Sequence, residues 1–322
     1  MRIAIHTGAS GLFGLGHATR MRALAAALAA QGASVSFLTP TPELGEVVSS
    51  FPCAAFVPDM GPEALPCDVF VEDVPPLYTS PSWWYAMLRQ HRRVVRVDVP
   101  TATPSTCDLL LAPCAHWAPE TVTALRTAFG SRFLFGWDYV LLDDAVTQFA
   151  RTPYAARVDG PVVLCAGGSD PGGALLQMAS WMGAAVKQED WVALVPRYGG
   201  PVSLPVWVRT EPFSRAWLRR ASLLLTTWGV TVYEGIWWGV PMLTVTSTDR
   251  TEADARRLET VSHNAATHLG HVETISAETM GTEIARVVAH PALRAQMAAV
   301  AAGLLDGFGA HRAATAILAL EN

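Results

Sequence analysis

A histidine stands in the first of two glycine-rich turns of this chain. The turn contains the pattern Gly14-Leu-Gly16-His17-Ala-Thr-Arg20. Glycine allows the backbone to adopt positive φ and allows a ligand to approach it closely. An imidazole held beside an anion site can take up or release a proton near neutral pH. The alternative interpretation is that His17 only caps a helix and that the glycines only permit a tight turn.

The second glycine-rich turn, Gly167-Gly168-Ser169-Asp170-Pro171, also allows two interpretations. Ser169 or Asp170 can cap the N-terminus of the following helix, and Pro171 fits its first turn. The paired glycines also expose backbone N–H groups of the kind that bind a diphosphate. Both roles stay open at the level of sequence.

Glu234 is a carboxylate in an otherwise apolar helical segment between Gly229 and Gly239. A carboxylate can accept two hydrogen bonds from the cis-diol of a ribose. The alternative is a solvated helix edge, which the apolar neighbours Val232 and Ile236 disfavour. If Glu234 does lie at such an edge, its replacement is expected to leave the fold intact.

Strand-like and helix-like runs alternate along the chain, which predicts parallel sheets covered by helices. In the first half we predict strands at residues 3–5, 35–38, 54–57, 69–72, 94–97 and 109–111, and helices at 19–30, 82–91, 119–129 and 143–157. In the second half we predict strands at 162–165, 192–195, 206–210, 223–226 and 242–245, and helices at 174–187, 215–220, 230–238, 256–264, 277–289, 293–304 and 310–320. Each half begins with a strand that leads into a glycine turn and a helix. Both turns are therefore expected at helix N-termini, where free N–H groups and the helix dipole favour anions.

Residues 158–161 resemble a linker, and we predict two α/β domains, residues 1–157 and 158–322, each Rossmann-like. A chain of 322 residues suits two domains of ordinary size. Two open parallel sheets of this kind would leave a cleft at the carboxyl ends of their strands.

The composition argues against several classes of protein. Hydrophobic residues make up 51% of the chain and charged residues 16%, and the net charge is −5, which disfavours a general nucleic-acid binder. No apolar run reaches the roughly 20 residues that cross a bilayer, and no secretory signal is visible, so we predict a cytoplasmic protein. The five cysteines form no Cys-x-x-Cys pair, and the nine histidines show no zinc spacing. The oligomeric state is not indicated.

Four motifs, in this order, resemble the UDP-sugar hydrolase of the pseudaminic acid pathway and its spore-coat polysaccharide relatives. They are the turn around His17, the turn of residues 167–171, Glu234 before Gly239-Val-Pro241, and Asp306-Gly-Phe-Gly-Ala-His-Arg312. That family belongs to the wider GT-B group, which includes the MurG-type N-acetylglucosaminyltransferases. The resemblance extends over nearly the whole chain.

The resemblance implies a GT-B fold, in which two Rossmann-like domains face each other across a cleft that binds a UDP-sugar. His17 matches the family's catalytic histidine. Neither a metal nor another cofactor is implied, because helix N-termini neutralise the leaving diphosphate. The residues implied at the nucleotide sugar are Gly14, Gly16, Gly167, Gly168, Ser169, Asp170, Gly229, Thr231 and Glu234.

The sequence departs from the hydrolase pattern at two places. The hydrolase has Asp-His-Tyr after its fourth strand, whereas here Asp73 is followed by Val-Pro-Pro-Leu-Tyr78, and its later Asn-Gln is replaced within residues 245–252. We therefore predict transfer of a sugar from a nucleoside diphosphate, by resemblance UDP, to an unidentified acceptor, with His17 as general base. The alternatives are a UDP-sugar hydrolase that uses water and a protein that binds nucleotide sugars without catalysis.

Overall fold

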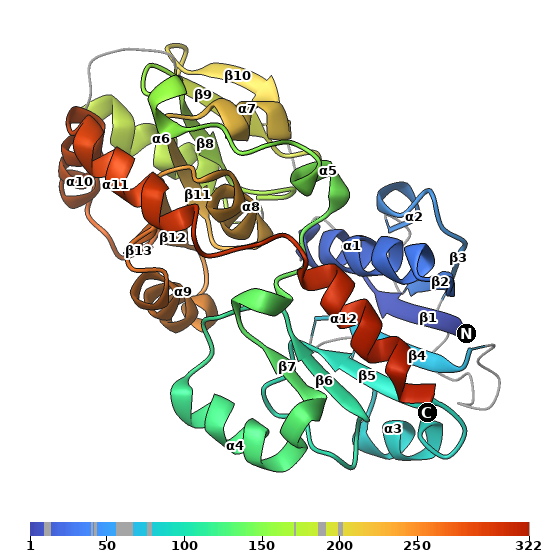
Figure 1. Cartoon of the computed structure of the whole chain (residues 1–322). Helices are drawn as coiled ribbons and strands as arrows, with labels where there is room; N and C mark the ends of the chain where they lie inside the picture. Colours follow the sequence, from blue (N-terminus) through green and yellow to red (C-terminus); the bar gives the residue numbers. More distant parts are fainter. Residues whose placement is uncertain are drawn as a thin grey trace. The chain divides into compact units, whose positions relative to one another are not determined.

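The computed structural model describes residues 1–9, 14–39, 41, 44–55, 67–75, 79–170, 172–185, 191–198 and 202–321. The chain divides into two compact units. Unit 1 comprises Met1–Asp144 together with Gly307–Asn322, and unit 2 comprises Ala145–Asp306. Each unit is a parallel β-sheet with helices packed on it (Figure 1).

The described part of unit 1 contains a sheet of seven strands in the order β3-β2-β1-β4-β5-β6-β7. These strands are β1 (Arg2–Thr7), β2 (Ser34–Thr39), β3 (Cys53–Ala55), β4 (Val69–Asp73), β5 (Arg93–Val97), β6 (Leu109–Ala112) and β7 (Phe133–Phe135). The chain extends the sheet on one side of β1 and then continues on the other side with β4. The strand order therefore reverses between β1 and β4.

Unit 2 has the same construction. Over its described residues the sheet has six strands in the order β10-β9-β8-β11-β12-β13. They are β8 (Val162–Cys165), β9 (Trp191–Val195), β10 (Arg209–Pro212), β11 (Leu223–Thr227), β12 (Met242–Thr246) and β13 (Ala266–His271). Here the order reverses between β8 and β11.

Helices connect the strands of each unit. Those of unit 1 are α1 (Gly16–Ala30), α2 (Leu44–Val47), α3 (Ser82–Leu88), α4 (Pro119–Phe129) and α12 (Gly309–Leu318). Those of unit 2 are α6 (Ala174–Ala185), α7 (Arg215–Arg220), α8 (Val230–Trp238), α9 (Asp249–Val261), α10 (Ala277–Ala289) and α11 (Pro291–Ala301), and α5 (Asp144–Thr147) begins at the division between the units. Short 3₁₀ turns complete the list: η3 (Gly130–Arg132), η4 (Trp137–Tyr139), η5 (Tyr154–Ala156) and η6 (Ala319–Glu321).

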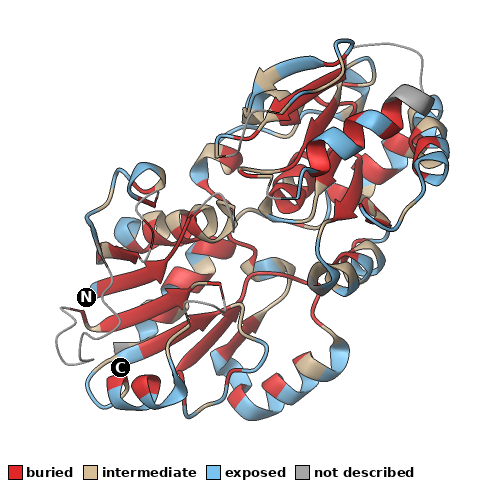
Figure 2. Ribbon diagram, turned by 180° about the vertical axis from the view of Figure 1, so that it is seen from behind, coloured by how far each residue is buried: buried red, intermediate tan, exposed pale blue. Residues whose placement is uncertain are grey.

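Most strands of both sheets are buried, as the red ribbons of Figure 2 show. All four residues of β6 and all five of β12 are buried. This is the burial pattern of parallel strands that are covered by helices on both faces. It explains why these strands appear in the sequence as nearly continuous apolar runs. The predicted α/β class with two parallel sheets is confirmed.

Helix α1 ends where the sequence predicts. Gly32 has φ 91°, a left-handed conformation that glycine adopts without strain. The N–H of Ala33 donates to the carbonyl of Leu28 at 3.1 Å, and the N–H of Gly32 donates to that of Ala29 at 3.0 Å. These are the hydrogen bonds of a glycine-terminated helix. The helix begins three residues earlier than predicted, so His17 lies inside its first turn.

The last helix belongs to unit 1, which differs from the predicted division at residues 157 and 158. Helix α12 lies beside α1 (Figure 1), and its Ala313 and Ile317 are part of the apolar core of unit 1. Gly309 is required at its start, because a Cβ there would overlap the carbonyl oxygen of Val140. Arg312 donates to the carbonyl of Asp138 at 3.1 Å. The motif of residues 306–312 thus returns the chain to its first unit.

Residues 143–157 do not form the predicted exposed helix, and residues 158–161 are not a free linker. Helix α5 ends at Thr147, and Pro153 disfavours a helical conformation at the residue before it. Buried Arg157 donates to the carbonyls of Trp238 at 3.0 Å and Gly239 at 2.6 Å, which anchors this segment to the end of α8. The buried hydrogen bonds of Arg157 outweigh the helical tendency of residues 143–157.

Three further differences concern strands. Strands β7 and β13 were not predicted, and β10 begins at Arg209 rather than at residue 206, because residues 205–208 form a turn closed by a bond from the Val208 N–H to the Pro205 carbonyl. The ends of the elements predicted at 54–57 and 174–187, together with Pro171 and Tyr78, lie outside the described residues. Within the described chain, no helix combines the length and apolar character that a membrane span requires.

Candidate active site

Each sheet has one position that favours ligand binding. Ligands of open parallel sheets bind outside the carboxyl ends of the strands, where the strand order reverses. In unit 1 this position lies between β1 and β4, and in unit 2 it lies between β8 and β11. The glycine turns singled out from the sequence follow β1 and β8. Fold topology and sequence motifs therefore indicate the same two places.

In unit 1, His17 meets a carboxylate that the sequence prediction did not include. Nδ1 of His17 lies 2.7 Å from Oδ1 of Asp73, the last residue of β4. Asp73 stands opposite Thr7, the last residue of β1, so the strand pairing itself brings β4's carboxylate beside α1. The side chain of Asp73 is 1% exposed, whereas that of His17 is 27% exposed. A buried carboxylate thus holds a partly accessible imidazole.

Arg20 completes this cluster from the next turn of α1. Its Nε donates to Oδ2 of Asp73 at 2.6 Å, and its Nη2 donates to Oδ1 at 2.6 Å. This two-pronged geometry is the strongest form of an arginine–carboxylate pair. Its Nη1 donates to Oδ2 of Asp98 at 2.9 Å. His17, Arg20, Asp73 and Asp98 together form what we call the base cluster.

Asp73 is a carboxylate at neutral pH. Burial would raise the pKa of its carboxyl group, but the charges and hydrogen bonds of Arg20 and His17 outweigh burial and lower that pKa to about 2. An ionised carboxylate only accepts hydrogen bonds, so Nδ1 of His17 carries the proton of the 2.7 Å contact. In the neutral imidazole, Nε2 is then the basic nitrogen.

Glu72 precedes Asp73, but its side chain takes part in a different network. Successive side chains of a strand point to opposite faces of the sheet. Glu72 is buried near His6, whose Nδ1 lies 3.2 Å away, and it accepts a hydrogen bond from the Tyr85 hydroxyl. Arg96 approaches the same carboxylate at 3.6 Å. The alternation along β4 thus separates this buried network from the base cluster.

Gly14 in the first turn has the predicted conformational role, whereas Gly16 does not adopt a positive φ. Gly14 has φ 77°, and Gly16 is the first residue of α1. No side chain caps this helix, because Leu15 occupies the N-cap position. Its first turn holds His17 and no acidic residue. The capping alternative for His17 therefore does not hold, since its Nδ1 bonds to Asp73 instead.

In unit 2, the second glycine turn contains a helix cap. Oδ1 of Asp170 accepts a hydrogen bond from the N–H of Ala174 at 2.8 Å, and Oδ2 accepts one from Leu175 at 2.9 Å. The capping interpretation of Asp170 is thus confirmed, and its carboxylate occupies two N–H groups at the start of α6. An anion bound at this turn could therefore not use these two N–H groups.

The remainder of this turn is held by its neighbours. Gly167 has φ 81°, Ser169 is buried, and the N–H of Tyr198 donates to the carbonyl of Gly168 at 3.1 Å. A Cβ on Gly172 would come within 3.3 Å of the Cβ of Ser247, so the turn also lies against the loop after β12. The backbone of the turn is therefore fixed from the β9 side and the β12 side.

Across the reversal point of unit 2, helix α8 begins without a side-chain cap. Its N-cap residue is Gly229, and Thr231 lies buried in its first turn. The sequence placed both residues at the nucleotide by resemblance. Their position at the carboxyl end of β11 is compatible with that role, and no contact to a ligand tests it.

Glu234 is not at a solvated helix edge. Its side chain is 3% exposed, and its Oε1 accepts hydrogen bonds from Nε and Nη2 of Arg215 at 3.0 and 2.8 Å. Helix α7 packs against α8 and supplies this arginine. A buried carboxylate needs such a partner because its desolvation is costly. The premise that Glu234 is an isolated carboxylate at a helix edge is therefore wrong, and its role at a ribose stays a proposal.

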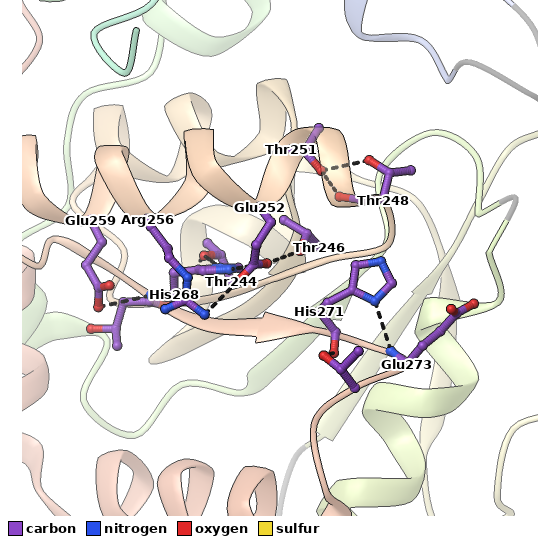
Figure 3. A network of polar contacts seen from close by, with 12 residues as sticks. Thr244, Thr246, Thr248, Thr251, Glu252, Arg256, Glu259, His268, His271 and Glu273 are labelled. Atoms are coloured by element: carbon purple, nitrogen blue, oxygen red, sulfur yellow. Dashed lines mark hydrogen bonds and ion pairs between the residues drawn. The ribbon is translucent and has the colours of Figure 1, made fainter. Parts of the chain in front are cut away.

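A further polar network, in unit 2, joins β12 and β13 to helix α9 (Figure 3). Oε2 of Glu252 accepts hydrogen bonds from the Thr246 hydroxyl at 2.6 Å and from Nε2 of His268 at 2.8 Å, while its Oε1 pairs with Arg256 at 2.7 Å. Nδ1 of His268 lies 3.2 Å from the Thr244 hydroxyl. This network fastens the start of α9 to the sheet, in the stretch that departs from the hydrolase pattern.

Asp73 and Asp98 were not predicted as site residues, although their positions at the ends of strands pointed to them. Asp73 ends β4, and Asp98 directly follows β5, the next strand of the sheet. Carboxylates at the carboxyl ends of strands beside the reversal point are expected to face a ligand site. Placing them beside His17 required the strand order, which the chain alone does not specify.

Several solved structures have a similar fold. MurG of Acinetobacter baumannii superposes with a TM-score of 0.63 at 15% identity, over 99% of this chain and 100% of that chain. MnaA of S. aureus, solved with UDP, gives 0.65 at 13% identity, over 100% and 97%. The spinosyn rhamnosyltransferase SpnG, complexed with spinosyn aglycone, gives 0.62 at 18% identity, over 100% of both chains. The fold is the GT-B fold.

No protein-family model and no curated protein matches the chain. The identities to the solved structures are too low to carry more than the fold. The specific resemblance to the UDP-sugar hydrolase is therefore not confirmed, whereas the GT-B fold is.

The base cluster predicts a pH-dependent contribution to stability. The pKa of Asp73 is about 2 in the folded chain and about 3.9 in an unfolded one, so its ionisation stabilises the fold above about pH 4, and this stabilisation is lost as the pH falls toward 2. Asp73→Asn should lower the free energy of unfolding by about 2 kcal/mol at pH 7, and this difference should shrink in acid. Urea denaturation across this pH range measures the difference in the free energy of unfolding.

Asp68→Asn, which removes an exposed partner of Arg2, is the control and should have a small effect. A difference for Asp73→Asn that does not vary with pH would contradict the assignment.

The Arg215–Glu234 pair predicts a second effect on stability. Glu234→Ala leaves the Arg215 guanidinium, which is partly accessible to water, without its buried partner, and should cost about 2–3 kcal/mol. Glu234→Gln keeps an oxygen acceptor of the same shape and should cost clearly less. Thermal unfolding of both variants measures the difference. Equal melting temperatures for Glu234→Ala and the wild type would show that the pair does not stabilise the fold.

Proposed function

We propose that this protein is a glycosyltransferase that transfers a sugar from a nucleoside diphosphate, most simply UDP, to a hydroxyl group of an acceptor. The observation that carries the proposal is the His17–Asp73 contact at the reversal point of the first sheet. The GT-B fold supports it, because similarly folded chains include MurG, a UDP-bound MnaA and a rhamnosyltransferase.

His17 is proposed as the general base. Its Nε2 takes the proton of the acceptor hydroxyl while the acceptor oxygen attacks the anomeric carbon and the bond from that carbon to the diphosphate oxygen breaks. Asp73 keeps Nδ1 protonated and stabilises the imidazolium that forms. The diphosphate leaves with the electron pair of the broken bond.

Unit 2 is proposed to hold the nucleotide. The backbone of Gly167, Gly168 and Ser169 and the uncapped start of α8 at Gly229 and Thr231 would donate hydrogen bonds to the diphosphate. Glu234 would accept hydrogen bonds from the ribose. Because Arg215 occupies its Oε1, the ribose hydroxyls would have to share the carboxylate or displace the arginine.

The direct test is incubation of the purified protein with UDP-sugars, with and without pools of hydroxyl-bearing acceptors, while UDP release and free sugar are measured separately. A transferase releases UDP chiefly when an acceptor is present. Rapid, saturable release of free sugar without an acceptor would instead establish a hydrolase. UDP binding without turnover of any sugar would establish a non-catalytic nucleotide-sugar-binding protein.

His17→Gln should lower kcat by about 10²–10⁴-fold while the affinity for UDP changes little, because a general base acts mainly in the transition state. Steady-state kinetics and calorimetry with UDP measure the two quantities. His91→Gln, which replaces an exposed histidine of the same unit, is the matched control. Unchanged kcat in His17→Gln would remove His17 from the mechanism.

The ribose assignment predicts a preference for UDP over 2′-deoxy-UDP. If the 2′-hydroxyl donates to Glu234, the wild type should bind UDP at least about tenfold more tightly, since one hydrogen bond to a charged group is worth about 1.5–3 kcal/mol. Glu234→Gln, which retains the shape of the side chain, should bind the two nucleotides more nearly equally. Calorimetry gives both ratios. The same ratio in wild type and variant would place the ribose elsewhere.

A further inference from the structure

Asp98 is held in an unusual conformation at the edge of the base cluster. It directly follows β5 and has φ 60°, a left-handed conformation that is uncommon for residues other than glycine and in which aspartate, asparagine and histidine are enriched. Its N–H donates to the carbonyl of Leu111 at 2.8 Å, which ties this backbone to β6. Strained residues persist where the surrounding structure determines them, and they concentrate at functional sites.

The carboxylate of Asp98 is directed at Arg20. Its Oδ2 accepts a hydrogen bond from Nη1 of Arg20 at 2.9 Å, and its side chain is 31% exposed. Arg20 therefore bonds two carboxylates at once, through Nε and Nη2 to Asp73 and through Nη1 to Asp98. The charges alternate from the imidazole outward: His17, Asp73⁻, Arg20⁺ and Asp98⁻.

This alternation decides how much negative charge His17 experiences. Nη2 of Arg20 lies 3.2 Å from Nδ1 of His17, so the guanidinium opposes the protonation of the imidazole, which Asp73 at 2.7 Å favours. With Asp73 and Arg20 alone, the surroundings of His17 would be neutral. With Asp98 they carry one net negative charge, which favours the imidazolium that a general base must become.

We propose that Asp98 is a positioning residue that holds Arg20 and offsets its charge, so that His17 is a stronger base than it would be beside Asp73 and Arg20 alone. The catalytic part of this inference rests on the proposed role of His17. The electrostatic part does not, because it concerns the proton affinity of the imidazole whatever reaction follows.

Within the described residues of unit 1, the ionisable groups that face this cluster come from four elements. Arg20 lies on α1, Asp73 on β4, Asp98 after β5, and His116 in the loop between β6 and α4. Burial and the charge of Asp73 raise the pKa of the Asp98 carboxyl, but Arg20 and, less strongly, His116 more than offset both and lower it. Asp98 is therefore ionised throughout the range in which a histidine titrates.

The experiment is an NMR titration of the His17 imidazole in the full chain, with the His17 signals assigned from their loss in His17→Gln. Asp98→Asn removes the charge and keeps both the shape and the tolerance of the left-handed conformation. It should move the midpoint of the His17 titration to lower pH. Asp73→Asn should lower it further, and Arg20→Gln should raise it. The signs thus alternate along the cluster.

The control is Asp68→Asn, which removes a carboxylate paired with Arg2 just before the opposite end of β4. It should leave the His17 titration unchanged. Asp98→Gly, which also suits φ 60°, replaces Asp98→Asn should the latter fail to fold. A His17 titration in Asp98→Asn that matches Asp68→Asn would overturn the inference.

Kinetics separate this inference from the proposed function. If both hold, the acid limb of the pH profile of kcat/KM moves to lower pH in Asp98→Asn by the amount found by NMR, and UDP affinity stays unchanged. A shifted NMR titration with no enzymatic activity in any assay would retain the role of Asp98 and reject the transferase. Activity without any shift in the titration would do the reverse.

Discussion

The contact between His17 and Asp73 depends on a buried charge that is compensated in place. A carboxylate that is 1% exposed is tolerated only because Arg20 engages both of its oxygens and the imidazole engages one. Two of these partners lie one helical turn apart on α1, and the third group ends β4. The start of α1 and the end of β4 are thereby held together at the reversal point of the sheet.

The same arrangement recurs in unit 2 with different chemistry. The turn after β8 is shaped by glycines and closed by the cap that Asp170 forms on α6. Beyond the reversal point, α8 begins at Gly229, and its Glu234 is neutralised by Arg215. Unit 1 therefore carries an imidazole held by a buried carboxylate, and unit 2 carries backbone N–H groups beside a balanced ion pair.

Several glycine and charged residues have structural explanations. Gly309 permits the close approach of α12 to the Val140 carbonyl, and Arg157 binds carbonyls at the end of α8. Glu252 collects Thr246, His268 and Arg256 at the start of α9. Each of these side chains satisfies buried polar groups or permits close packing, and none of them needs a ligand to account for its position.

The sequence alone determined the class of fold, most elements and the place of His17. It could do so because apolar runs, glycine turns and helix ends are local signals: α4, α7, α8, α10 and β8 have the predicted bounds. The sequence could not show that α12 belongs to unit 1 or that residues 143–157 leave the helical path, because contacts with distant residues decide both. It also could not place Asp73 beside His17 or Arg215 on Glu234. These partners are separated by 56 and 19 residues, and only strand order and helix packing bring them within hydrogen-bond distance.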